Sequence, residues 1–129
     1  MITGAVTAAL EATIPLRVRG AGRRTRLVQA VIDTGFDGSL TLSPAIVMAL
    51  GLPRRGRERG VLADGSVALF HVYDATVVWD GRRRPVLVAV AGGAPLVGTA
   101  LLAGHELTVD FAAGGSVRIG PLPVDSGPP

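Results

Sequence analysis

The segment Val31–Gly35 reads Val-Ile-Asp-Thr-Gly, and it determines how the rest of the chain is interpreted. Asp33 directly follows an apolar run, Leu27–Ile32, with the composition of a buried strand. A carboxylate at the end of a core strand is costly to desolvate unless it is paired, hydrogen-bonded or functional. Thr34 offers a hydroxyl group and Gly35 an unobstructed N–H, and both could fix the orientation of Asp33. The Asp-Thr-Gly tripeptide alone also fits an ordinary turn, so the rest of the sequence is needed to choose between a turn and a functional carboxylate.

Length and composition restrict the class of protein. The chain has 129 residues, which fits one domain, here placed at residues 1–120, followed by a Pro/Gly-rich tail at residues 121–129. Cysteine is absent, which excludes disulfides, thiolate nucleophiles and Cys-ligated zinc. The two histidines, His71 and His105, are too far apart for a His-X-X-X-His metal pair and are interpreted as ordinary strand or turn residues. No metal or cofactor is expected.

The hydropathy pattern predicts no membrane span. No apolar run reaches the roughly 20 residues that a spanning helix needs. Met1–Leu16 lacks the basic start of a signal peptide, and Glu11 interrupts its apolar run. We therefore expect no membrane association and a cytoplasmic location.

Frequent glycine and proline separate short segments rich in Val, Ile, Leu and Thr, which predicts a mostly-β domain. The clearest helix lies between Ser43, a good N-cap followed by Pro44, and Gly51 at the C-terminal end. A second short helix is expected near Thr99–Ala103, ended by Gly104. The expected strands are one or two within 4–19, then 26–33, 39–42, 61–62 with 67–69, 75–79 with 85–90, 107–111 and 117–119. Together they favour a small closed or half-closed barrel.

Two Asp-Gly pairs predict β-hairpins. Asp64-Gly65 separates Val61–Leu62 from Val67–Leu69, and Asp80-Gly81 separates two longer apolar runs. Asp-Gly supplies the positive φ angles that a type I′ turn requires. We therefore expect a type I′ turn at each pair.

The basic residues are all arginine, and the net charge is +3. They cluster at 54–59 and 82–84. The first cluster is flanked by helix-breaking residues and contains no aromatic residue to stack on a base, so it is interpreted as a solvated loop. A small nucleic-acid-binding barrel is a weaker alternative, which a steep salt dependence of DNA or RNA binding would support; no nucleic-acid partner is expected.

Three elements in order carry a resemblance to a known family. Val31–Gly35 is followed by a short strand, Ser39–Leu42; a hairpin surrounds Asp64–Ser66; and Leu96-Val97-Gly98 precedes a short helix and the strand Leu107–Phe111. This arrangement resembles the clan AA aspartic proteases, in particular their single-domain retropepsin-like group. The helix after Ser43 resembles the bacterial members more than the viral ones.

The resemblance implies a closed acid-protease barrel and an aspartic endopeptidase that acts as a homodimer on peptide or protein substrates. Asp33 would be the catalytic residue, one from each subunit. Thr34 would hydrogen-bond across the dimer axis, Gly35 would donate its N–H towards the carboxylate, and Gly98 would allow close packing beneath the loop. The hairpin at Asp64, Gly65 and Ser66 would be a flap that closes over substrate.

The chain also departs from the family pattern. Some retropepsin-like enzymes carry an arginine just after the downstream glycine, paired with an acid beyond Asp-Thr-Gly; here Thr99 stands there, so Asp37 lacks that partner. Asp37 is either a contact to the substrate main chain or a solvated turn residue. The tail segment Asp125–Gly127 reads Asp-Ser-Gly, but no second lobe follows it, and we interpret it as a coincidence.

Other interpretations remain open from the sequence. No Gly-X-Ser-X-Gly elbow and no His-Glu-X-X-His helix occurs, which argues against two other classes of hydrolase. The main alternative is a catalytically silent retropepsin-like module for dimerisation or peptide binding, because a fold does not imply an activity. Dimerisation fits both readings, whereas loss of cleavage in Asp33→Asn separates them.

Overall fold

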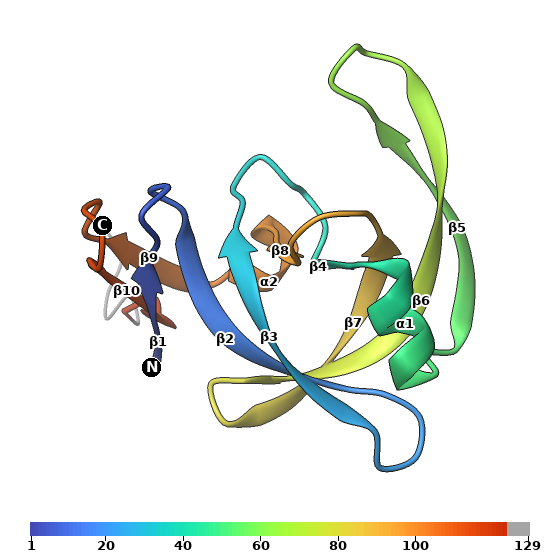
Figure 1. Ribbon diagram of the computed structural model, residues 1–129, viewed down its shortest axis with the longest axis horizontal. Coiled ribbons are helices and arrows are strands. Elements are labelled where there is room, and N and C mark those ends of the chain that lie inside the picture. Colours follow the sequence, from blue (N-terminus) through green and yellow to red (C-terminus); the bar gives the residue numbers. More distant parts are fainter. Residues whose placement is uncertain (124–129) are drawn as a thin grey trace, which may run out of the picture.

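A computed structural model describes residues 1–123 and shows a mostly-β chain with two short helices (Figure 1), as the sequence predicts. The strands are β1 (Ile2–Val6), β2 (Ala12–Arg19), β3 (Thr25–Ile32), β4 (Leu40–Leu42), β5 (Arg54–Val61), β6 (Val67–Trp79), β7 (Arg82–Val90), β8 (Leu96–Val97), β9 (His105–Val109) and β10 (Ser116–Pro121). The helices are α1 (Pro44–Leu50) and α2 (Thr99–Leu102). The tail segment Asp125–Gly127 lies outside the described residues.

The strands form one curved sheet in the order β5-β6-β7-β4-β8-β3-β2-β1-β10-β9. An additional antiparallel pairing joins one end of β2 to β6, so the middle of the sheet bends back on itself. The outermost strands, β5 and β9, do not pair with each other. The β2–β6 pairing joins β2, β3, β8, β4, β7 and β6 in a ring, while β1, β10, β9 and β5 extend beyond it. The predicted mostly-β fold is confirmed as a single curved sheet, which is not a clearly closed barrel.

Alternation of apolar and polar residues explains which face of the sheet is buried. In β2, Ile14, Leu16 and Val18 are buried, while the residues between them are more exposed. Such a period of two is what a strand with one face against a core requires. Other side chains of the same core are Leu40, Val77, Val88, Val97, Leu101, Val117 and Ile119, all fully buried.

Helix α1 begins and ends where the sequence predicts. The Ser43 hydroxyl accepts a hydrogen bond from the Ile46 N–H at 3.4 Å, and Pro44 occupies the first turn. Gly51 ends the helix in the left-handed conformation, with φ 59°. Val47 and Leu50 are the residues that the helix buries. Its position depends on local capping signals, which is why the sequence was sufficient to place it.

The two Asp-Gly hairpins form, but only one has the predicted turn. Asp80 and Gly81 both have positive φ, 51° and 78°, as a type I′ turn requires. At the other hairpin Gly65 alone has a positive φ, 84°, and its N–H donates to Leu62 O at 2.9 Å. The Leu62 N–H also donates to Ser66 O at 2.8 Å, which leaves a loop of three residues, Ala63–Gly65, between this pair. The prediction of a type I′ turn there is therefore wrong. Gly65 occupies the left-handed position that closes three-residue hairpin loops.

The prediction of a solvated loop at the first arginine cluster is also wrong. Arg54–Val61 is strand β5, paired with β6 from Arg54 opposite Tyr73 to Val61 opposite Val67, with a register shift between Arg54 and Gly56. The residues are solvated, as expected, because β5 is an edge strand with most of its side chains exposed. Charged side chains are a common feature of edge strands, since they discourage pairing with a further strand.

The C-terminal part follows the prediction with shifted boundaries. Helix α2 is one residue shorter than expected, at Thr99–Leu102. The last hairpin is β9 with β10, and β9 begins at His105 and ends before Phe111, which is exposed. Among residues 1–123, no helix is long and apolar enough to cross a membrane.

Candidate active site

Three strands position the Asp-Thr-Gly segment. Strand β8 lies between β3 and β4, parallel to β3 and antiparallel to β4. Ile32, the last residue of β3, is opposite Val97, and so is Leu40, the first residue of β4. The chain from Asp33 to Ser39 therefore forms a loop whose two ends are both fixed against β8.

Asp33 is anchored at the beginning of this loop. Its N–H donates to Val97 O at 2.9 Å, which continues the pairing of β3 with β8 by one residue. Its carboxylate oxygen Oδ1 accepts a hydrogen bond from the Gly35 N–H at 2.9 Å. Asp33 is only half-buried, so the carboxylate has a fixed orientation and remains accessible to water. This combination suits an acid or base that must meet a substrate.

Gly98 leaves the space that the loop needs. A Cβ atom at this position would lie 2.2 Å from Gly38 O and 2.5 Å from Phe36 Cδ2, much closer than atoms pack. The Gly98 N–H also donates to Ser39 O at 3.0 Å. The loop therefore packs closely against Gly98 because this residue has no Cβ atom, and the Gly98 N–H also binds the loop backbone.

The other two predicted residues of the loop face solvent. Thr34 and Asp37 are both exposed. The Thr99 hydroxyl donates to Phe36 O at 3.3 Å and not to Asp37. The ion pairs among residues 1–123 join Asp80, Asp74 and Asp110 to cations, and none of them includes Asp37.

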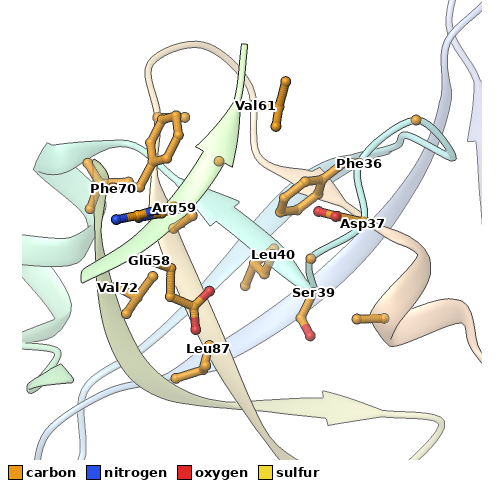
Figure 2. Close-up of a pocket in the computed structure, with 17 residues that line it drawn as sticks. Phe36, Asp37, Ser39, Leu40, Glu58, Arg59, Val61, Phe70, Val72 and Leu87 are labelled. Carbon is orange, nitrogen blue, oxygen red and sulfur yellow. The ribbon is translucent and has the colours of Figure 1, made fainter. Parts of the chain in front are cut away.

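A cleft of about 700 Å³ opens between the Asp33 loop and the β5–β6 hairpin. The hairpin projects from the body of the molecule (Figure 1), and Figure 2 shows the side chains that line the cleft beneath it. The walls are mainly apolar. The lining residues are Gly35–Leu40 of the loop, Glu58–Val61 of β5, Phe70 and Val72 of β6, Leu87 and Ala89–Ala91 on and after β7, and Ala100.

The register of β5 against β6 determines on which face of the hairpin each charged side chain of β5 begins. Glu58 is opposite Phe70, whereas Arg57 and Arg59 are opposite His71 and Leu69. Since successive residues of a strand point to opposite faces, Glu58 shares the face of Phe70 and the side chains of both arginines begin on the other face, although Arg59 also lines the cleft. In Figure 2 the Glu58 carboxylate points towards Leu87, while the Arg59 guanidinium points away from it.

The predicted substrate-binding residues at the hairpin tip do not line this cleft. Asp64, Gly65 and Ser66 are exposed at the outer end of the hairpin. Lining residues from the middle of the hairpin, Glu58–Val61 with Phe70 and Val72, were missed. They were missed because an arginine- and glycine-rich segment was not interpreted as a strand, and the sequence offers no apolar alternation there that would have indicated one.

Asp64 stabilises the turn at the hairpin tip. Its Oδ1 accepts hydrogen bonds from the Ser66 hydroxyl at 2.5 Å and the Ser66 N–H at 2.9 Å. The hydroxyl bond, followed by the backbone bond, lowers the pKa of the Asp64 carboxyl below its ordinary value. Hydrogen bonds that favour the ionised form have this effect.

Replacing Ser66 with alanine is expected to raise the pKa of Asp64, because the largest cause of its lowering is removed. A depressed folded-state pKa stabilises the fold above the unfolded value, and that stability is lost as pH falls through the folded value. The variant should therefore lose less stability on acidification than the native chain. NMR titration of the carboxyl carbons measures the pKa, with Asp80 as an internal control because the Met1 ammonium group lowers its pKa independently. An unchanged Asp64 titration would contradict the assignment.

The hydrogen bonds of His105 are those of a structural residue. His105 Nε2 accepts a hydrogen bond from the Trp79 ring N–H at 3.1 Å, and its Nδ1 lies 3.0 Å from Ala103 O. It is an ordinary hydrogen-bonded histidine at the start of β9. Within residues 1–123, no group of three or more His, Asp or Glu side chains is arranged to hold a metal ion.

Comparison with models of known protein families and with curated proteins finds no match for this chain. The functional interpretation therefore depends on the geometry of the Asp33 loop and the cleft beside it.

Proposed function

We propose that this protein is an aspartic endopeptidase of retropepsin-like type that acts as a homodimer. The observation that carries the proposal is the oriented, water-accessible carboxylate of Asp33, hydrogen-bonded to the Gly35 N–H at 2.9 Å, in a loop that borders the cleft. The Val-Ile-Asp-Thr-Gly sequence and the downstream Leu-Val-Gly that packs beneath it support the same assignment.

The proposed chemistry requires a second carboxylate. Two carboxylates at close range cannot both stay ionised, so they share one proton. The ionised member accepts a proton from water, which attacks the scissile carbonyl carbon, and the protonated member stabilises the developing oxyanion. The pair titrates as a unit.

A homodimer would supply that second carboxylate. The chain has one Asp-Thr-Gly segment, so Asp33 of a second copy has to complete the site across a two-fold axis. Thr34, exposed at the tip of the loop, is available to hydrogen-bond to the other subunit. Such a contact would fix the separation of the two carboxylates.

The cleft provides room for an extended peptide. Its apolar walls, which include Phe36, Leu40 and Leu87, favour apolar side chains of the substrate. The β5–β6 hairpin lies over this space and has a free edge on β5, to which an extended backbone can add. Closure of the hairpin would exclude water from the reacting bond.

Cleavage of a diverse peptide library tests the proposal. The native chain and Asp33→Asn are incubated with the library from acid to neutral pH, at concentrations that populate a dimer, and products are identified by mass spectrometry. Cleavage by the native chain alone is expected, with apolar residues next to the cut sites.

The other outcomes argue against an aspartic endopeptidase. Equal cleavage by both chains would assign the activity to another residue or to a contaminant. No cleavage by either chain, combined with binding of library peptides to the cleft, would favour a silent peptide-binding module on the same fold.

A further inference from the structure

Helix α2, directly after Gly98, is too short to be stable by itself. It contains the four residues Thr99–Leu102, and no side chain caps its N-terminus. A single turn of helix is unstable in water without tertiary contacts. Leu101 is fully buried and provides one such contact. The others come from the groups at its two ends.

The N-terminal N–H groups of α2 bind the Asp33 loop. The Thr99 N–H donates to Phe36 O at 2.8 Å, and the Ala100 N–H donates to Gly38 O at 3.1 Å. The first N–H groups of a helix have no partner within the helix, so they are free to make such bonds. The position of α2 therefore fixes the backbone of the loop just after Asp-Thr-Gly.

The other end of α2 is held by Arg84 of β7. Its guanidinium donates from Nη1 to Leu101 O and from Nη2 to Ala100 O, both at 3.0 Å. Two parallel bonds from one planar group fix orientation as well as distance. A positive charge is also favourable beside the carbonyls at the C-terminal end of a helix. No ion pair among residues 1–123 includes Arg84, so these two carbonyls are its polar partners there.

We propose that Arg84 is a positioning residue for the Asp33 loop, acting through α2. Arg84 binds carbonyl groups of α2 while the loop binds its first N–H groups, so loss of Arg84 would let α2 move away from Phe36 and Gly38. Arg84 reaches α2 from β7 and binds two of its main-chain carbonyls. The catalytic part of this inference rests on the proposed function.

The test compares Arg84→Gln and Arg84→Lys with Arg83→Gln. Arg83 precedes Arg84 on β7, so its side chain points to the opposite face, and it makes no side-chain hydrogen bond among the described residues. With a peptide that the native chain cleaves, kcat of Arg84→Gln should fall by about ten- to a hundred-fold, as for a small misplacement of reacting groups. KM should change little. Arg84→Lys keeps the charge but not the two parallel bonds, so it should recover only part of kcat.

Amide hydrogen exchange supplies a readout that does not need activity. In Arg84→Gln the Thr99 and Ala100 N–H groups should exchange at least about ten-fold faster than in Arg83→Gln, while the N–H of the buried Val117 on β10, which does not pair with β7, should be unchanged. Unchanged exchange at Thr99 and Ala100 would overturn the inference, as would equal kcat in Arg84→Gln and Arg83→Gln. If Arg84→Gln unfolds, the same comparisons are decided with Arg84→Lys. If no chain cleaves any peptide, the proposed function fails, and the exchange data still decide whether Arg84 positions α2.

Discussion

Replacing Asp33 with asparagine is expected to reduce peptide cleavage by at least about 1,000-fold, because each dimer loses both groups that move protons. The fold should be retained, since the asparagine Oδ1 can accept the Gly35 N–H as the carboxylate does at 2.9 Å. Steady-state kinetics with a peptide from the library measure the loss, and the thermal midpoint reports the fold. Asp110→Asn is the matched control, because Asp110 is also a locally hydrogen-bonded carboxylate but lies at the β9–β10 end of the sheet.

Mixing the two chains tests whether the site is shared between subunits. If native and Asp33→Asn chains pair at random in equal amounts, about a quarter of the dimers contain two native chains, and activity per native chain falls to about half. A site contained within one chain would keep its full activity in the mixture. Such a result, after exchange of subunits has been verified, would contradict the homodimeric mechanism even if Asp33 proved essential.

Local signals in the sequence were sufficient for much of the fold. Ser43, Pro44 and Gly51 determine α1 because capping depends on residues only a few positions apart. Asp80-Gly81 gave the correct turn for the same reason. Asp64-Gly65 led to the wrong turn type, because the length of that loop is set by the register of β5 against β6, in which Val61 is opposite Val67. Register is a property of the paired strands and is not contained in the two turn residues.

The parts of the candidate site that depend on contacts between residues far apart in the sequence could not be predicted. The Asp33 loop was recognised because an acid directly after an apolar run is conspicuous in one sequence. Strand β5 was missed because its backbone partners on β6 stabilise it, and its own residues give no strand pattern. Arg84 was missed because its partners are the carbonyl groups of Ala100 and Leu101, which every residue possesses and no sequence pattern marks.

Substituting alanine for Gly98 is expected to destabilise the fold by about 3 kcal/mol, in the upper range for overpacking. The φ of Gly98 is −103°, which any residue can adopt, so the cost comes from lack of space. The added Cβ would lie 2.2 Å from Gly38 O and 2.6 Å from Phe36 O. Neither oxygen is free to move, since they accept the hydrogen bonds from Ala100 and Thr99.

Gly92→Ala is the matched control for this substitution. Gly92 precedes β8 by a few residues, its φ is not in the left-handed region, and an added Cβ meets nothing within 4 Å. Its free energy of unfolding should change by no more than about 0.5 kcal/mol. Denaturant unfolding measures the free energy of unfolding of both variants. Equal values would show that the loop can shift to make room for the added methyl group. A loop that yields so easily could not hold the Asp33 carboxylate in a fixed orientation, so stability at Gly98 also tests whether the candidate site is preorganised.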